Sequence, residues 1–307
     1  MRNDFAVFIL SHGRPDRVLT IKSLRRCGYT GKIYIIVDDE DDCIDRYKKL
    51  SDVDIIVFSK DAIANTCDTC DNVSKKNIVL YARNSCHAIA KDLNLTYFLE
   101  LDDDYSEFRS RMLIDGKLCT IYVRDFDRIV DVVLEFLENS GAHTVAFAQT
   151  GDFIGGAGSR VFKERLARKA MNSFFCKTDR PFKFYGRINE DVNAYVLNGS
   201  RGELYFTIAD VSLDQCTTQA YKGGLTESYL EMGTYVKSFY TVICCPSSVK
   251  VHVMGCNHKR IHHIIDWEHA VPKIISGDFK KGGKHNENHT KNIQTTGDGV
   301  KSSKGLF

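Results

Sequence analysis

Short apolar runs alternate with amphipathic stretches along the first hundred residues of the chain. The runs have the length of buried strands, and they lie at residues 4–10, 32–39, 53–58 and 96–104. The stretches between them carry apolar residues three or four positions apart, as helices do, and they lie at residues 16–27, 42–50 and 78–93. This alternation predicts βαβ units and a mostly parallel central sheet flanked by helices, a Rossmann-like α/β fold.

The alternation loosens in the second half of the chain. A well-marked helix is expected at residues 124–139, where Gly141 closes it, and a glycine-rich stretch occupies residues 151–160. The strands expected in this half lie at residues 143–150, 202–213 and 250–255. We interpret both halves as parts of a single large domain.

Composition and charge narrow the picture only a little. The formal net charge is +2, so any basic patch for a polyanion must be local. No window approaches eighteen uncharged apolar residues, and we therefore expect no membrane partner. The eleven cysteines lack a framework spacing, which indicates reduced thiols and a cytoplasmic setting.

Three consecutive aspartates, Asp102, Asp103 and Asp104, end the fourth apolar run. Ligands of open α/β sheets bind beyond the carboxyl ends of the strands, which is where these side chains would lie. Alternate strand residues share a side, so Asp102 and Asp104 are expected to face one ligand while Asp103 points away. Two carboxylates suit Mg²⁺ or Mn²⁺, which can also hold a diphosphate. The alternative is a solvated acidic turn.

Other polar groups are expected at the same edge of the sheet. Asp38 ends the second run and could accept from a base N–H or a ribose hydroxyl, or could be a solvated strand-end acid. Arg83 lies in the helix before the fourth run and could approach phosphate or Asp102, unless it forms a surface ion pair. The first run is followed by Ser11, His12 and Arg14.

Four segments in this order resemble a known family. "ILSHGRP", "VDDE", "YARNSC" and "LELDDDY" are similar to segments of GT-A nucleotide-sugar glycosyltransferases. More narrowly, they resemble the TET-associated glycosyltransferases of phages, which modify hydroxymethylated pyrimidines in phage DNA. The resemblance covers residues 5–110 well and the rest loosely, and it rests on the order and spacing of the segments together.

The resemblance implies a GT-A fold, a UDP-sugar donor and Mn²⁺ or Mg²⁺. Asp102 and Asp104 would be the D-x-D pair, with Asp104 the more direct metal ligand. Asp38 would contact uracil or ribose, and Arg83 would support the pyrophosphate. The nucleotide pocket would be lined by Ser11, His12 and Arg14.

The resemblance also suggests a division of labour along the chain. Residues 1–120 would form the nucleotide-sugar-binding half and residues 121–276 the sugar- and acceptor-binding half of one domain. Residues 277–307 hold more lysines than acids, and we expect a flexible basic tail there. Gly155 and Gly156 would let the backbone approach a bound ligand, unless they only form a turn.

An acidic pair in the second half is the candidate for the catalytic base. Glu190 and Asp191 in "GRINEDVNAYV" precede an apolar run, and one of them could accept the proton of the attacking hydroxyl. Asp191 is slightly favoured. An inverting reaction would use such a base, whereas a retaining one would not, and the inverting reaction is slightly favoured. The alternative is a helix N-terminus, where acids are favourable in any case.

Late histidines and cysteines offer a further metal ligand. His252, or less favoured His258, could complete the shell of the divalent cation, as a late histidine does in many GT-A enzymes. The competing interpretation is a zinc site. Its ligands would be Cys67 and Cys70 with two of Cys244, Cys245, Cys256 and His258.

Residues 160–187 carry nine Lys or Arg and only two acids. Such a segment favours phosphate contacts, and its aromatic residues could stack on bases. These aromatic residues are Phe162, Phe174, Phe175, Phe182, Phe184 and Tyr185. The alternative is an amphipathic helix with a solvated basic face, in which Phe162 packs into the core.

The leading hypothesis is therefore a metal-dependent glycosyltransferase, hexosyl or pentosyl. It would act on 5-hydroxymethylcytosine or 5-hydroxymethyluracil in double-stranded phage DNA, in the host cytoplasm. Rival hypotheses keep the chemistry but take a glycan, lipid or protein acceptor, or make the chain a non-catalytic DNA-binding protein with a degenerate sugar site. A two-metal phosphoryl-transfer enzyme is weakened because no Lys-bearing phosphate loop is present. The oligomeric state stays open.

Overall fold

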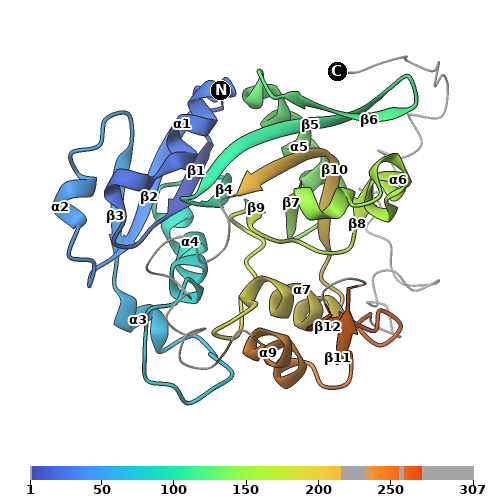
Figure 1. Cartoon of the computed structure of the whole chain (residues 1–307). Coiled ribbons are helices and arrows are strands. Elements are labelled where there is room, and N and C mark those ends of the chain that lie inside the picture. Colours follow the sequence, from blue (N-terminus) through green and yellow to red (C-terminus); the bar gives the residue numbers. More distant parts are fainter. Residues whose placement is uncertain (1, 216–232, 234, 256–258, 272–307) are drawn as a thin grey trace, which may run out of the picture. The chain divides into compact units, whose positions relative to one another are not determined.

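The computed structural model describes residues 2–215, 233, 235–255 and 259–271. One large sheet carries the described fold, with the strand order β3-β2-β1-β4-β9-β7-β10-β5-β6 and with β8 paired to β10 (Figure 1). Strands β3, β2, β1, β4, β7, β10 and β6 point one way, and β9, β5 and β8 point the other. The sheet is therefore mostly parallel, as predicted.

The first four strands and the helices between them follow the predicted alternation. The strands are β1 (Phe5–Leu10), β2 (Lys32–Asp38), β3 (Asp54–Phe58) and β4 (Tyr97–Asp102). The helical segments are η1 (Pro15–Arg17), α1 (Leu19–Arg26), α2 (Ile44–Tyr47), α3 (Lys60–Ala64) and α4 (Leu80–Asp92). Every residue of β1 is buried, because helices cover both faces of the sheet at this strand.

The fourth strand ends two residues earlier than predicted. The chain turns at Asp103 and Asp104 and returns as β5 (Tyr105–Ile114), which forms a hairpin with β6 (Lys117–Tyr122). The hairpin was not predicted, because the mixed polar and apolar residues of β5 match neither a buried strand nor a helix. The relative positions of Asp102 and Asp104 are therefore set by a turn, and not by the alternation of side chains along one strand.

The second half adds the rest of the sheet and its cover. Its strands are β7 (Thr144–Gln149), β8 (Leu166–Ala167), β9 (Ser173–Lys177) and β10 (Tyr205–Gln215). Its helical segments are α5 (Phe126–Ser140), η2 (Thr150–Phe153), η3 (Gly156–Gly158), α6 (Arg160–Glu164), α7 (Glu190–Ser200) and α9 (Val236–Cys244). A separate antiparallel pair joins β11 (Val249–Met254) to β12 (Arg260–Ile265).

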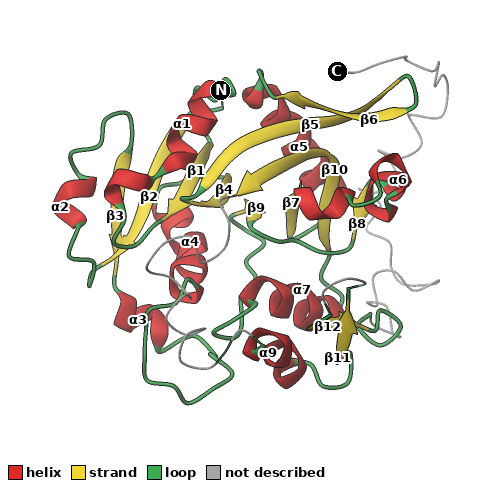
Figure 2. Cartoon of the chain, in the orientation of Figure 1, coloured by secondary structure: helices red, strands yellow, loops and turns green. Residues whose placement is uncertain are grey.

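Two apolar layers hold the sheet in place. One joins the sheet to α1 and α5, and the other joins it to α4 and α7, on the opposite side (Figure 2). Gly28 lets α1 end against the start of α5. Its φ is +88°, and a Cβ there would stand 2.4 Å from the carbonyl oxygen of Arg124. Residues 277–307 and the predicted basic tail lie outside the described residues.

Candidate functional site

The three aspartates after β4 differ in their surroundings. Asp103 is 1% exposed, accepts a hydrogen bond from Ser11 Oγ at 2.5 Å, and pairs with Arg14 Nη2 at 2.9 Å. Burial raises the pKa of Asp103 to about 6, although the Arg14 cation opposes the rise. Asp103 therefore ties the turn to the residues that follow β1.

Asp104 has one oxygen without a hydrogen-bond partner among the described residues. Its Oδ1 is buried and accepts no hydrogen bond from the described residues, while its Oδ2 accepts one from Gln215 Nε2 at 3.4 Å. Burial, and then the charges of Asp102 and Asp103, raise the pKa of Asp104 to about 7. Burying an oxygen without a hydrogen-bond partner beside two other carboxylates is energetically unfavourable, and a bound divalent cation would offset that cost.

Arg83 organises the carboxylates behind this turn. It is 2% exposed and donates to Glu100 at 2.7 Å, to both oxygens of Asp102 at 3.0 and 3.2 Å, and to Glu190 at 2.9 Å. Arg83 was expected to approach either phosphate or Asp102, and in the structure it contacts Asp102. A second donor, Tyr105 Oη, reaches Asp102 at 3.1 Å. Glu100 and Tyr105 were not anticipated.

The acidic pair opens α7 and differs in partners. Glu190 is held by Arg83, whereas Asp191 Oδ1 accepts from the backbone N–H of Val192 at 2.7 Å. Asp191 is 8% exposed, and burial followed by the Glu190 charge raises its pKa to about 7. A carboxyl group with such a pKa can exchange a proton near neutral pH.

The ends of β1 and β2 form a second polar group on the same edge. Asp38 accepts from His12 Nδ1 at 2.7 Å and pairs with Lys60 Nζ at 2.6 Å. Burial alone would raise the pKa of Asp38, but the hydrogen bonds from His12 and Lys60 outweigh it and lower that pKa. The hydrogen bond to Asp38 raises the pKa of His12, whose side chain is 43% exposed. Ser11 and Arg14 lie beside this group.

Lys60 was missed by sequence reasoning. It is 3% exposed and opens α3 two residues after β3 ends, so the strand-end rule that selected Asp38 also applies to it. Tyr47 was missed as well. Its hydroxyl hydrogen-bonds Ser11 Oγ at 2.7 Å and accepts from the backbone N–H of Arg14 at 2.9 Å.

The glycine-rich loop follows the carboxyl end of β7. Gly155 and Gly156 have φ of +96° and +62°, so both adopt the left-handed backbone that favours glycine. The adjoining Thr150 donates its hydroxyl to Asp214 Oδ1 at 2.7 Å, next to the Gln215 that reaches Asp104. The loop therefore lies on the side of the sheet that carries the aspartates.

The predicted histidine and zinc ligands lie elsewhere or outside the described residues. His252 is exposed on β11, opposite His262 of β12, and His258 and Cys256 are not described. Cys70 Sγ lies 2.6 Å from Cys244 Sγ, while Cys67 Sγ accepts from Asn84. Within residues 2–215, 233, 235–255 and 259–271, no three His, Cys, Asp or Glu side chains are grouped as a metal site.

The aromatic residues of the basic segment are not a stacking surface. Phe162, Phe174, Phe175, Phe182 and Phe184 are all at most 7% exposed and pack in the core, and Tyr185 is half-buried. That prediction was wrong, because much of the segment passes through the fold, where β9 forms part of the sheet. Arg187 is 1% exposed and is bound to Asp71 at 2.7 Å. Phe162 does pack in the core, as the alternative interpretation had it.

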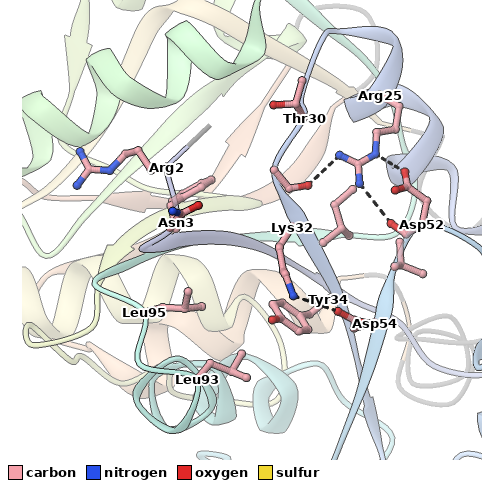
Figure 3. A pocket seen from close by; sticks show the side chains of 14 residues that line it. Arg2, Asn3, Arg25, Thr30, Lys32, Tyr34, Asp52, Asp54, Leu93 and Leu95 are labelled. Carbon is pink, nitrogen blue, oxygen red and sulfur yellow. Dashed lines mark hydrogen bonds and ion pairs between the residues drawn. The ribbon is translucent and has the colours of Figure 1, made fainter.

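A cavity of about 860 Å³ lies at the opposite, amino edge of the sheet (Figure 3). Figure 3 shows Arg25 paired with Asp52 and Lys32 directed at Asp54, at 2.5 and 3.8 Å. The groups at its rim already satisfy one another, and the carboxylate chemistry lies at the other edge. We therefore place the candidate site at the carboxyl edge and not in this cavity.

A mostly parallel sheet with acids gathered beyond the carboxyl ends of β4 and β2 has the arrangement in which open α/β proteins bind their ligands. The chain belongs to the TET-associated glycosyltransferase family, whose model matches residues 5–224. This match confirms the family resemblance seen in the sequence and identifies the chain as a glycosyltransferase.

Solved structures similar to the chain include glucosyl-3-phosphoglycerate synthase from Mycobacterium tuberculosis, in complex with Mn²⁺, UDP and phosphoglyceric acid. It is 11% identical, with 85% of this chain and 86% of the synthase covered and a TM-score of 0.44. An active-site mutant of LgtC is 12% identical over 57% of this chain and 58% of its own, with a TM-score of 0.35. No curated protein sequence matches the chain. None of the described helices is long and apolar enough to cross a membrane.

Proposed function

We propose that this glycosyltransferase moves a sugar from a UDP-sugar to the hydroxymethyl group of a modified pyrimidine in DNA, with Mn²⁺ or Mg²⁺ bound by Asp104 and Asp102. The carrying observation is the buried Oδ1 of Asp104, which accepts no hydrogen bond from the described residues. The bound cation would offset the negative charge that develops on the departing diphosphate. His252 remains a further candidate ligand.

The nucleoside end of the donor would meet the group at the ends of β1 and β2. Asp38 accepts from His12, from Lys60 and from the backbone N–H of Glu40, and its two carboxylate oxygens retain acceptor capacity for a base N–H or a ribose hydroxyl. Ser11 and Arg14 would border this pocket, and Lys60 would bring a positive charge close to the nucleotide. The loop at Gly155 and Gly156 would approach the transferred sugar.

Asp191 would act as the base, because Glu190 is already bound by Arg83. The acceptor hydroxyl oxygen forms a bond to the anomeric carbon as the bond between that carbon and UDP breaks, and the hydroxyl proton passes to Asp191. This route inverts the anomeric carbon. Arg83 would position Glu190 and Asp102 and would influence the pyrophosphate only through them.

The DNA acceptor is supported by the family to which the chain belongs. The phenylalanines of the basic segment are buried, but the exposed side chains of Lys163 and Arg168 can still contact phosphates. On this proposal residues 1–120 serve mainly the donor and residues 121–276 mainly the sugar and acceptor. The setting would be the cytoplasm of a phage-infected host.

Mass spectrometry of hydroxymethylated duplex DNA, incubated with a panel of UDP-sugars and Mn²⁺, tests the proposal. We expect a mass gain of one sugar with one donor, lost when the metal is chelated and in Asp104→Asn. The matched control is Asp131→Asn on the exposed face of α5, which should keep full activity. If no donor adds mass to DNA while a glycan, lipid or protein in the same mixture is glycosylated, the proposed acceptor is wrong.

A further inference from the structure

Ile154 stands out on the surface of the molecule. Its side chain is 83% exposed, and no other large apolar residue among those described exceeds 58%. Single exposed apolar residues are common on protein surfaces, so the exposure gains meaning only from what surrounds Ile154. The sequence gives it glycines on both sides, at Gly151 and Gly155.

The residues before Ile154 are firmly anchored. Asp152 accepts from the backbone N–H of Gln149 at 3.0 Å and pairs with Lys169. Phe153 is 7% exposed, packs against Phe162 at 6.3 Å between ring centroids, and is covered by the Arg111 guanidinium at 4.6 Å. Ile154 therefore projects from an anchored segment of the backbone, and its exposure does not come from a loose loop.

Hydrogen bonds link this anchored segment to the turn that carries Asp104. Thr150, at the start of η2, donates to Asp214, and the next residue, Gln215, donates to Asp104. The contacts run without a gap from the loop, through the end of β10, to the turn after β4. Ile154 is thus connected, through Thr150, Asp214 and Gln215, to the turn that holds the candidate metal ligand Asp104.

The segment around Ile154 is basic in sequence, and part of its charge is paired. Residues 150–170 contain five Lys or Arg and two acids. Arg160 pairs with Glu164, Arg165 with Asp210 and Lys169 with Asp152, whereas Lys163 and Arg168 are exposed. An apolar tip among cations is the combination by which proteins wedge a base step apart while binding the phosphates on either side.

We infer that Ile154 is a wedge that enters the base stack of duplex DNA and opens it beside the modified base, so that its hydroxymethyl group reaches the donor. The inference rests on the proposed DNA acceptor. A hydroxymethyl group in a paired, stacked base needs such an opening, whereas the same base in a single strand does not. Ile154 is a positioning residue, since it acts on the stack and not on the reacting atoms.

The test compares transfer to a duplex and to the single strand of the same sequence, each with one 5-hydroxymethylcytosine. In Ile154→Ser we expect the ratio of the duplex rate to the single-strand rate to fall ~10-fold, because unstacking loses its apolar support. Ile154→Leu should restore the ratio. Val132→Ser, which removes a 49% exposed apolar side chain from α5, is the matched control and should leave the ratio unchanged.

A second measurement needs no transfer. A fluorescent 2-aminopurine placed beside the modified base should brighten when the wild type binds the duplex, and should stay dim with Ile154→Ser at saturation. An unchanged rate ratio together with equal brightening would overturn the wedge, even if the wild type glycosylates DNA. If the wild type glycosylates neither the duplex nor the single strand, the proposed DNA acceptor is wrong. The fluorescence measurement alone then tests whether Ile154 opens the base stack. Loss of binding to anionic vesicles, with unchanged fluorescence on DNA, would assign Ile154 to a membrane surface and also overturn it.

Discussion

Replacing Arg83 by methionine tests the electrostatic design of the site. One buried guanidinium serves three carboxylates, those of Glu100, Asp102 and Glu190, and Glu100 is 1% exposed. Even with Arg83 present, burial raises the pKa of Glu100 to about 7. Without it, the carboxylates lose their shared counter-charge.

We expect Arg83→Met to lower the free energy of unfolding by about 3–5 kcal/mol, the usual cost of leaving a buried charge unpaired. That is a large part of the ~5–15 kcal/mol that holds most domains folded. Adding Glu100→Gln should recover part of the loss, because a neutral amide needs no counter-charge. Arg46→Met removes an exposed arginine paired with Asp16 and should have no measurable effect.

The pH dependence gives the sign of the effect. A carboxyl group whose folded pKa lies above its unfolded value takes up a proton on folding, so stability falls as the pH rises through the window between them. For Glu100 that window begins at the ordinary value of 4.5, reaches about 7, and extends upward when Arg83 is removed. The deficit of Arg83→Met in urea unfolding, followed by circular dichroism, should therefore be larger at pH 8 than at pH 5. A deficit below 1 kcal/mol at pH 8, or one that grows at pH 5, would refute the reasoning.

Three further predictions follow from the geometry. Because burial raises the pKa of Asp191 to about 7, the rate of transfer should rise with pH through that value, and Asp191→Asn should lower kcat by about 10²–10⁴-fold and flatten the pH profile. Gly28→Ala should lower the thermal midpoint clearly more than Gly116→Ala, because both glycines have positive φ but only the first would place its Cβ against backbone. Equal shifts would contradict this. Cys70 and Cys244 should form a disulfide when treated with a disulfide oxidant, seen by peptide mapping and absent in Cys244→Ser, since their sulfur atoms already touch.

Much of the fold was predictable because β1, β2, β3 and β4 are short apolar strands separated by amphipathic helices. The strand-end rule then placed Asp38 and Asp102 at the carboxyl ends of β2 and β4, where the structure has them. Neither inference needed contacts between residues distant in sequence.

The failures have a common physical cause. The segment with Phe174 and Phe175 is basic and aromatic, and such a composition fits an exposed nucleic-acid surface or a strand whose aromatic side chains are buried. Only packing against the rest of the sheet distinguishes an exposed surface from a buried strand, and the local sequence does not specify that packing. Glu100 was missed for the same reason, because its partner Arg83 lies on another element of the fold. Lys60 could have been found, because it closely follows the end of β3.

The three aspartates differ in the hydrogen-bond and ion-pair partners of their side chains. Asp103 is fully engaged by Ser11 and Arg14, and Asp102 is held by Arg83 and Tyr105. Asp104 alone of the three has a buried oxygen without a partner among the described residues. If the triplet served only as an acidic turn, exposure to water would satisfy that oxygen at no cost. Its burial instead costs stability that a bound cation would return, so added Mn²⁺ should stabilise the folded chain and Asp104→Asn should abolish that effect.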